Sequence, residues 1–181
     1  MRIISGILGG RIIQPPAHMP HTRPTTDIAK ESLFNIIQNN IDIEGIKTLD
    51  IFGGTGSVSY ELFSRGAADL TIVEKDVKMN AFIEKTAAML NITTLKCVKM
   101  DVFSFLANCN EQYNFIFAGP PYALNTIDQL PKMIIDRKLL QPNGWFVLEH
   151  TPRNDYSGYE KFIQQRNYGT TVFSFFINRD K

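Results

Sequence analysis

Apolar positions along this chain alternate between a strand-like and a helix-like pattern. Short, almost continuous apolar runs are typical of buried strands, and between them apolar residues recur at helical spacing. The strand-like runs are residues 48–52, 70–73, 95–98, 115–118 and 145–149. The helical segments between them cover about 57–65, 79–90, 102–107 and 127–134. This alternation predicts an α/β fold, with a mostly parallel sheet and helices on both faces.

The two ends of the chain follow a different pattern. Residues 162–166 and 171–177 are β-like runs around Tyr168-Gly169, a hairpin signal that predicts an antiparallel last strand and seven strands in all. Near the start, residues 2–5 and 11–14 flank glycines and predict a second hairpin, which a proline-rich connector follows.

A helix with a polar cap separates this connector from the rest. Hydroxyls and Asp27 precede a helical apolar pattern from about Ile28, as at a capped helix start. We therefore expect an appendage at residues 1–26, comprising the hairpin and connector, and a compact catalytic domain at residues 27–181.

Charge adds one feature to this picture. The chain has 181 residues and a net charge of +1, as expected for one ordinary globular domain. Residues 1–30, however, hold four basic side chains against one acidic side chain, a local balance of +3. Such a basic arm favours a polyanionic partner. A solvated N-terminus is the alternative interpretation.

Other functional classes are disfavoured. Cys97 and Cys109 are too few for a disulfide framework or a cysteine metal site, and the three histidines show no metal-ligand spacing, so we expect no metal. No apolar segment resembles a signal peptide or reaches the ~18 residues of a membrane span. The sequence therefore predicts a cytoplasmic protein with no membrane partner.

Acidic residues and glycines gather where the predicted strands end. The first strand carries Asp50 and runs into Phe52-Gly53-Gly54-Thr55-Gly56, a turn lacking the spacing of phosphate-binding loops. Asp50 would repel a pyrophosphate but suits a cationic amine. Glu74 ends the next strand, where an acid binds ribose hydroxyls, and Asp101 ends the third, where it can meet an adenine amine. Together these groups predict S-adenosylmethionine, unless the three acids lie at strand ends by chance.

The fourth strand ends in Gly119-Pro120-Pro121-Tyr122. Two prolines make a rigid corner and leave carbonyls outside the sheet ladder, where they can accept from an exocyclic amine. Tyr122 offers a flat face on which a nucleic-acid base can stack. A structural corner with a core tyrosine is the alternative. Likewise, His150 beside Glu149 suggests a general base, but such an end-of-strand pair is more often structural or substrate-lining.

Taken together, these residues resemble a known family. The glycine turn and Pro120-Pro121-Tyr122 are similar to those of class I S-adenosylmethionine-dependent methyltransferases that act on amino groups. The opening six residues, the Thr-Arg-Pro-Thr segment at 22–25 and Leu148-Glu149-His150 resemble, more narrowly, bacterial 16S ribosomal RNA guanine-N2 methyltransferases of the RsmD family. The resemblance covers nearly the whole chain and implies a Rossmann-like class I methyltransferase fold.

The resemblance also implies roles for the matching positions. The turn with Asp50, Phe52, Gly53, Gly54 and Gly56 would bind the cofactor, with Glu74 on its ribose and Asp101 on its adenine side. Gly119, Pro120, Pro121 and Tyr122 would form the catalytic amine site. Arg2, Arg11, Arg23 and Thr25 would contact RNA. The implied substrate is the N2 of a guanine in 16S rRNA, in the small subunit or its assembly intermediate, and we expect a monomer.

One departure from the family pattern concerns the catalytic corner. The family has Asp or Asn where this chain has Gly119, and that side chain accepts a hydrogen bond from the target amine. Losing it could raise the barrier by ~2–4 kcal/mol, by analogy with an oxyanion-hole donor. The enzyme would then be slow, use another acceptor, or be a relative that only binds RNA. An amino-methyltransferase acting on DNA adenine or on a small molecule is a further alternative.

Overall fold

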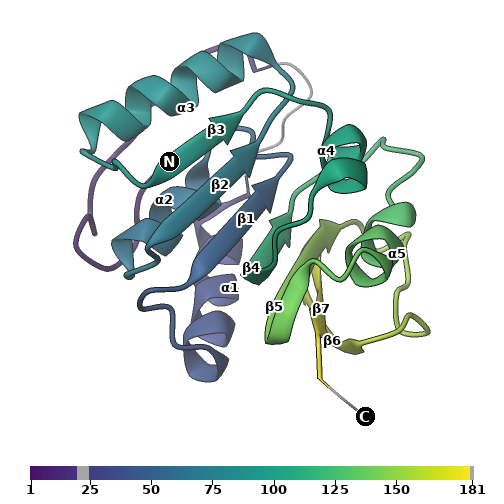
Figure 1. Ribbon diagram of the computed structural model, residues 1–181. Helices are drawn as coiled ribbons and strands as arrows, with labels where there is room; N and C mark the ends of the chain where they lie inside the picture. The colour runs from purple at the N-terminus through teal and green to yellow at the C-terminus, as the bar shows by residue number, and fades with distance from the viewer. Residues whose placement is uncertain (20–24, 180–181) are drawn as a thin grey trace.

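A seven-stranded sheet runs through the protein in the order β3-β2-β1-β4-β5-β7-β6 (Figure 1). The structure is a computed structural model, and it describes residues 1–19 and 25–179. The strands are β1 (Lys47–Ile51), β2 (Asp69–Val73), β3 (Leu95–Val98), β4 (Tyr113–Ala118), β5 (Leu140–His150), β6 (Phe162–Tyr168) and β7 (Thr171–Ile177). The helices are α1 (Asp27–Asn40), α2 (Ser57–Ser64), α3 (Val77–Met89), α4 (Val102–Asn108) and α5 (Gln129–Asp136).

The direction of the strands confirms the predicted architecture. β1 pairs in parallel with β2 and β4, and the parallel pairing continues to β3 on one side and β5 on the other. β7 is antiparallel to both β5 and β6. The turn between β6 and β7 uses Gly169 at φ 64, a left-handed conformation that glycine adopts without strain. The seven-stranded, mostly parallel sheet with an antiparallel last strand is therefore confirmed.

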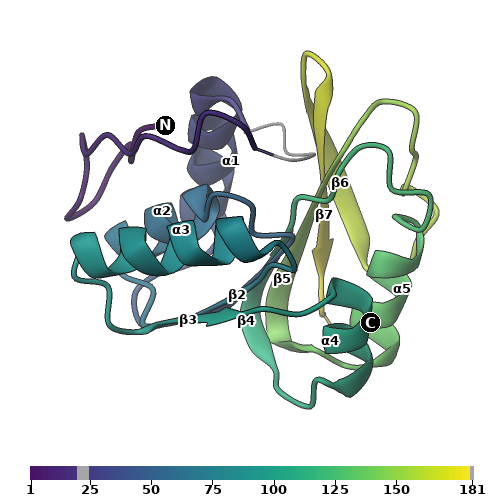
Figure 2. The ribbon, with the colours of Figure 1, turned by 90° about the horizontal axis from the view of Figure 1, so that it is seen from above.

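Helices cover both faces of the sheet. Figure 2 shows α1, α2 and α3 on one side and α4 and α5 on the other. Successive side chains of β4 point to opposite faces of the sheet and pack on the two helical layers. Phe115 and Phe117 pack with α1 and α2, whereas Ile116 and Ala118 pack with α4 and α5. This double burial explains why β4 is an uninterrupted apolar run in the sequence.

β5 departs most from its expected bounds, and α5 contains a proline. β5 begins at Leu140, five residues before the apolar run, because a register shift lets polar residues join the strand ahead of Trp145. α5 includes Pro131, which sits in the first turn, where a backbone N–H has no intrahelical acceptor to lose. Proline therefore does not interrupt this helix.

Residues 1–19, the N-terminal arm, fold back on α2 and α3. Its two predicted β-like runs pair through a single antiparallel bridge between Arg2 and Ile12, supported by the hydrogen bond from Ile3 N to Arg11 O at 2.9 Å. Ile3 and Ile13 are buried in a small cluster with Tyr60 and with apolar residues at the end of α3. The arm thus has its own apolar contact with the domain. The division at residues 26 and 27 stays a prediction.

Candidate active site

A pocket of about 570 Å³ lies at the carboxyl ends of the parallel strands. That volume is in the range of small-molecule sites, and this edge is where open α/β sheets bind ligands. Its walls come from the turn after β1, the ends of β2, β4 and β5, and the start of α4. The predicted residues that line it are Thr25, Asp50, Phe52, Gly53, Gly54, Glu74, Asp101, Gly119, Pro120, Pro121 and Tyr122.

The glycine turn brings backbone to the pocket wall. Phe52 has φ 60 and Gly54 has φ 56, so the chain turns sharply on leaving β1, and Phe52 holds a strained conformation. Gly53 lies so close to β2 that an added Cβ would come 2.1 Å from Ile72 Cγ2. Gly56, at φ 80, would bring a Cβ to 2.6 Å from the Tyr60 ring. Gly56 therefore shapes the turn from behind and does not line the pocket itself.

Glu74 is fixed by backbone amides at the end of β2. Its Oε2 accepts from Gly54 N at 2.9 Å and its Oε1 from Asp76 N at 2.9 Å. Asp101 caps α4 and accepts from Ser104 N at 3.0 Å, with its side chain exposed at the rim. Two carboxylates expected to bind one ligand are therefore oriented before the ligand arrives.

Asp50 is a buried acid beneath the glycine turn. Ser59 donates a hydrogen bond to its Oδ2 at 2.9 Å. Burial, assisted by the nearby charges of Glu74 and Glu149, raises the pKa of Asp50 to about 8. Near neutral pH this carboxyl is therefore mostly protonated, and a cation brought beside it would favour its ionised form.

The corner after β4 is connected to the end of β5. The Tyr122 hydroxyl donates to Glu149 Oε1 at 3.0 Å and lies 3.1 Å from Thr171 Oγ1. Thr25, which the sequence places at the substrate side, donates to Glu149 Oε2 at 2.7 Å. Thr25, Tyr122 and Glu149 are far apart in the sequence and therefore meet in the fold. Glu149 is only 4% exposed.

His150 has a structural position. It is fully buried, its Nε2 lies 2.7 Å from Ser174 Oγ and its Nδ1 lies 2.8 Å from Thr151 O. Its ring packs edge-on against Tyr156, and burial lowers the pKa of the imidazole. His150 does not line the pocket, which agrees with the structural alternative for this histidine, whereas Glu149 does line it.

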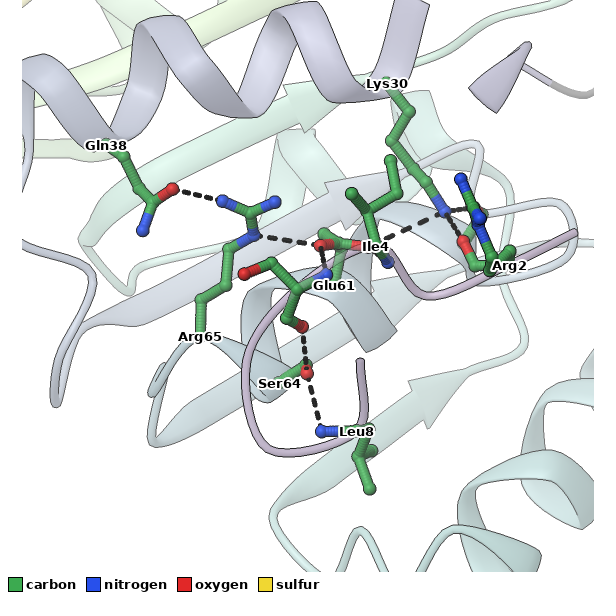
Figure 3. A network of polar contacts seen from close by, with 10 residues as sticks. Arg2, Ile4, Leu8, Lys30, Gln38, Glu61, Ser64 and Arg65 are labelled. Carbon is green, nitrogen blue, oxygen red and sulfur yellow. Dashed lines mark hydrogen bonds and ion pairs between the residues drawn. The ribbon is translucent and has the colours of Figure 1, made fainter. Parts of the chain in front are cut away.

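The N-terminal arm is fastened by buried charges (Figure 3). The carboxylate of Glu61, which is fully buried, accepts from Ile4 N at 2.8 Å, from Ser5 N at 3.0 Å and from Arg65 Nε at 2.9 Å. Gly6 approaches α2 so closely that a Cβ would lie 1.8 Å from Ser64 O. Ser5 and Gly6 therefore dock the arm on α2.

Lys30 joins the arm to the glycine turn. Its side chain is 1% exposed, and its ammonium donates to Arg2 O at 2.6 Å and to Ser57 Oγ at 3.1 Å and lies 3.7 Å from Glu61 Oε2. Burial lowers the pKa of this group, and the Glu61 charge opposes that shift. Because Ser57 lines the pocket, the arm and the cofactor side share one buried polar network.

The expected RNA contacts are only partly described. Arg2 and Arg11 are exposed on the arm, so both guanidinium groups are accessible to a polyanion. Arg23 lies outside the described residues. Thr25 points instead to Glu149, inside the pocket.

Some pocket residues were missed by sequence reasoning. Phe103 packs edge-on against Phe52 at 6.4 Å between ring centroids, and both rings line the pocket. Ser57 and Asp76 also contribute. Only Asp76 had a signal: it lies between β2 and α3 and caps α3 by accepting from Met79 N at 2.9 Å.

Residues 1–19 and 25–179 contain neither a candidate metal site nor a candidate membrane-spanning helix. In this part of the chain no three His, Cys, Asp or Glu side chains group as metal ligands. Nor does any helix there combine the length and the apolar character needed to cross a bilayer.

Comparisons with known proteins agree with this geometry. Residues 1–177 match the family described as conserved hypothetical protein 95. Ribosomal RNA small subunit methyltransferase D of Escherichia coli (strain K12) is 33% identical over 149 residues, which cover 82% of this chain and 71% of that protein.

Solved structures share the fold. The "Putative methyltransferase yhhF" from Escherichia coli has a TM-score of 0.86 at 25% identity, covering 100% of this chain and 99% of that one. SMU.776, a "putative methyltransferase complexed with SAH", has a TM-score of 0.63 at 18% identity over 81% of this chain and 49% of that one. The Rossmann-like fold is therefore confirmed, and the chain belongs to the RsmD family of methyltransferases.

Proposed function

We propose that this protein transfers a methyl group from S-adenosylmethionine to the exocyclic N2 of a guanine in the 16S rRNA of the small ribosomal subunit. The observation that carries the proposal is one pocket that joins the glycine turn and Glu74 to the Pro120-Pro121-Tyr122 corner. Membership of the RsmD family supplies the substrate class, since the Escherichia coli relative is named for the small-subunit rRNA.

The residues of the pocket fit the cofactor. S-adenosylmethionine supplies a methyl group on a cationic sulfur, and the neutral thioether, SAH, keeps the electron pair of the broken bond. Glu74 offers carboxylate oxygens to ribose hydroxyls, and Phe52 and Phe103 offer aromatic walls to adenine. Asp50, buried beneath the turn, suits the cationic part of the ligand. These assignments rest on chemistry and position, and SMU.776 in complex with SAH supports them at the level of the fold.

The corner after β4 supplies the substrate side. Pro120 and Pro121 leave the sheet ladder, and Tyr122 is held in place by its hydroxyl contacts to Glu149 and Thr171. A base stacked beside Tyr122 would present its amine toward the cofactor, so alignment would supply much of the rate enhancement. The nitrogen of a base amine is a weak nucleophile, which makes this positioning necessary.

Methyl transfer to undermethylated small-subunit particles tests the proposal. We expect tritium from labelled S-adenosylmethionine to enter 16S rRNA at a single guanine under single-turnover conditions. Glu74→Ala, which removes a proposed cofactor ligand, serves as the low-activity control when the cofactor is kept below saturation. If the protein binds the cofactor but incorporates no tritium, the enzyme interpretation is wrong. The protein would then be a catalytically impaired RNA-binding relative, the alternative that Gly119 favours.

Offering adenine-bearing DNA and small amines beside the ribosomal particles tests the substrate class. Preferential methylation of DNA would overturn the rRNA assignment while keeping the methyltransferase.

We also propose that the N-terminal arm binds rRNA phosphates through Arg2 and Arg11. The double substitution Arg2→Ala/Arg11→Ala should weaken RNA binding and lower its salt slope by about one for each phosphate that is no longer neutralised. Lys132→Ala is the matched control, because Lys132 is an exposed cation on α5, on the opposite face of the sheet from the arm. Equal salt slopes for the arm variant and the control would exclude the arm from the interface.

A further inference from the structure

Gly119 gives the corner after β4 no acceptor side chain at that position, but a carboxylate stands beside it. Parallel pairing of Ala118 with Leu148 places the next two residues, Gly119 and Glu149, side by side at the ends of β4 and β5. Neighbouring strands are about 4.8 Å apart, so adjacent side chains share one space. An added Cβ on Gly119 would lie 3.9 Å from Glu149 Oε2.

Glu149 is oriented toward this space by contacts from distant parts of the chain. Thr25 Oγ1 donates to its Oε2 at 2.7 Å and the Tyr122 hydroxyl to its Oε1 at 3.0 Å. A carboxylate has about four acceptor sites, so accepting from two hydroxyls does not by itself prevent it from accepting from an amine. Its burial, with 4% exposed, strengthens any hydrogen bond made there.

We propose that Glu149 is the acceptor of the target amine, in the place of the Asp or Asn that the family carries at position 119. The inference rests on the proposed function and deepens it. One N–H of the amine donates to Glu149 Oε2, which directs the nitrogen lone pair at the methyl group. As the N–C bond forms, the nitrogen gives up one proton along this hydrogen bond to the carboxylate, which releases it to solvent.

The fit at Gly119 explains why the acceptor is found on β5. A Cβ at position 119 would come 3.1 Å from Phe117 Cε1, so a side chain there requires the ring to shift by a few tenths of an ångström. An aspartate would also bring a second carboxylate against Glu149, and two like charges at such a distance disfavour ionisation. Glycine at position 119 therefore leaves Glu149 without a second carboxylate beside it.

Moving the acceptor back to β4 tests the proposal. Glu149→Gln keeps the size of the side chain but loses the charge and one acceptor oxygen, and we expect the single-turnover rate to fall about 100-fold. In the double variant Glu149→Gln/Gly119→Asn an amide oxygen stands at the end of β4, and we expect at least tenfold recovery of that rate. Glu149→Gln/Gly119→Ala is the matched control, since it places the same Cβ against Phe117 without adding an acceptor.

The readouts separate a catalytic role from a structural one. The dissociation constant of S-adenosylmethionine, measured above pH 8 so that Asp50 is ionised with or without the Glu149 charge, should stay within error in all variants. The melting temperatures of the two double variants should agree with each other, because both place a Cβ against Phe117. Rescue by Gly119→Asn and not by Gly119→Ala supports the acceptor role.

An unchanged rate in Glu149→Gln, with an active parent, would overturn the inference alone. Loss of activity that Gly119→Asn fails to rescue would also overturn it and would assign Glu149 to positioning Tyr122 and Thr25. An inactive parent that binds cofactor would instead overturn the proposed function.

Discussion

The two halves of the pocket are built in different ways. On the cofactor side, Glu74 and Asp101 are held by backbone amides: Glu74 by Asp76 and by Gly54, which lies 20 residues earlier in the turn after β1, and Asp101 by Ser104. On the base side, Glu149 is held by hydroxyl groups of Thr25 and Tyr122, 124 and 27 residues away.

This difference bears on how each half responds to change. Backbone amides at a turn are positioned by the strand and helix that flank them, so the cofactor half keeps its geometry through most side-chain substitutions. Hydroxyl groups on distant segments hold their partner only while the whole domain is folded around them. We therefore expect substitutions in the cofactor half to change affinity and substitutions in the base half to change rate.

Removing Glu74 should produce the largest effect. Glu74→Ala takes away two charged hydrogen bonds that we assign to ribose hydroxyls, at about 1.5 kcal/mol each, so the dissociation constant of S-adenosylmethionine should rise about 100-fold. Isothermal titration calorimetry measures it. The rate at saturating cofactor should fall much less.

The Gly54 and Asp76 amides also lose their acceptor in this variant, so its melting temperature should be recorded beside the affinity. Unchanged affinity in a folded variant would remove Glu74 from the cofactor site.

Asp50 should make cofactor binding depend on pH. With its pKa raised to about 8, the carboxyl is protonated in the ligand-free protein below that pH, and a cationic ligand must displace the proton. The affinity should therefore rise by up to about tenfold per pH unit from pH 6 to 8. Calorimetry in buffers of different ionisation enthalpy should show release of one proton. In Asp50→Asn both effects should disappear.

The raised pKa of Asp50 should also make the stability of the ligand-free protein depend on pH. An unfolded aspartate ionises above its ordinary pKa of 3.8, whereas folded Asp50 keeps its proton up to about pH 8. The folded state then binds one more proton, so the free energy of unfolding should fall as pH rises between these values, by up to ~1.4 kcal/mol per unit. Urea denaturation at a series of pH values measures this dependence. The free energy of unfolding of the Asp50→Asn variant should fall less steeply with pH than that of the parent. Identical slopes would mean that Asp50 ionises normally in the fold.

The contrast between the two halves also explains what the sequence could predict. The glycine turn and Glu74 follow apolar runs directly and Asp101 lies three residues after one, so their place at one sheet edge follows from the parallel direction of the strands. The contact of Thr25 with Glu149 depends on how the segment before α1 reaches the pocket, which no local pattern encodes. For the same reason Phe103 and the buried Lys30 network were missed, since both depend on packing between elements that are distant in sequence.

Tyr122→Phe should have a moderate effect confined to the base half. The ring that we expect to stack on the base remains, but Glu149 and Thr171 no longer have the hydroxyl as a partner. We expect the single-turnover rate to fall about tenfold, equivalent to one neutral-to-charged hydrogen bond of ~1.4 kcal/mol. The cofactor dissociation constant should not change. Tyr122→Ala, which also removes the stacking face, should cost more, and equal reductions in both variants would remove stacking from the role of Tyr122.

Thr171→Val should have the smallest effect on the rate, because Thr171 is linked to the base half through the Tyr122 hydroxyl. Thr171 Oγ1 lies 3.1 Å from the Tyr122 hydroxyl, and Tyr122 keeps its bond to Glu149 without it. Valine preserves the shape of a β-branched residue at the start of β7, so the strand should be unaffected. We expect the rate to fall about twofold, within ~0.5 kcal/mol. A reduction as large as that of Tyr122→Phe would show that Thr171, and not Glu149, fixes the tyrosine, and the orientation of the acceptor proposed on β5 would then not depend on Tyr122.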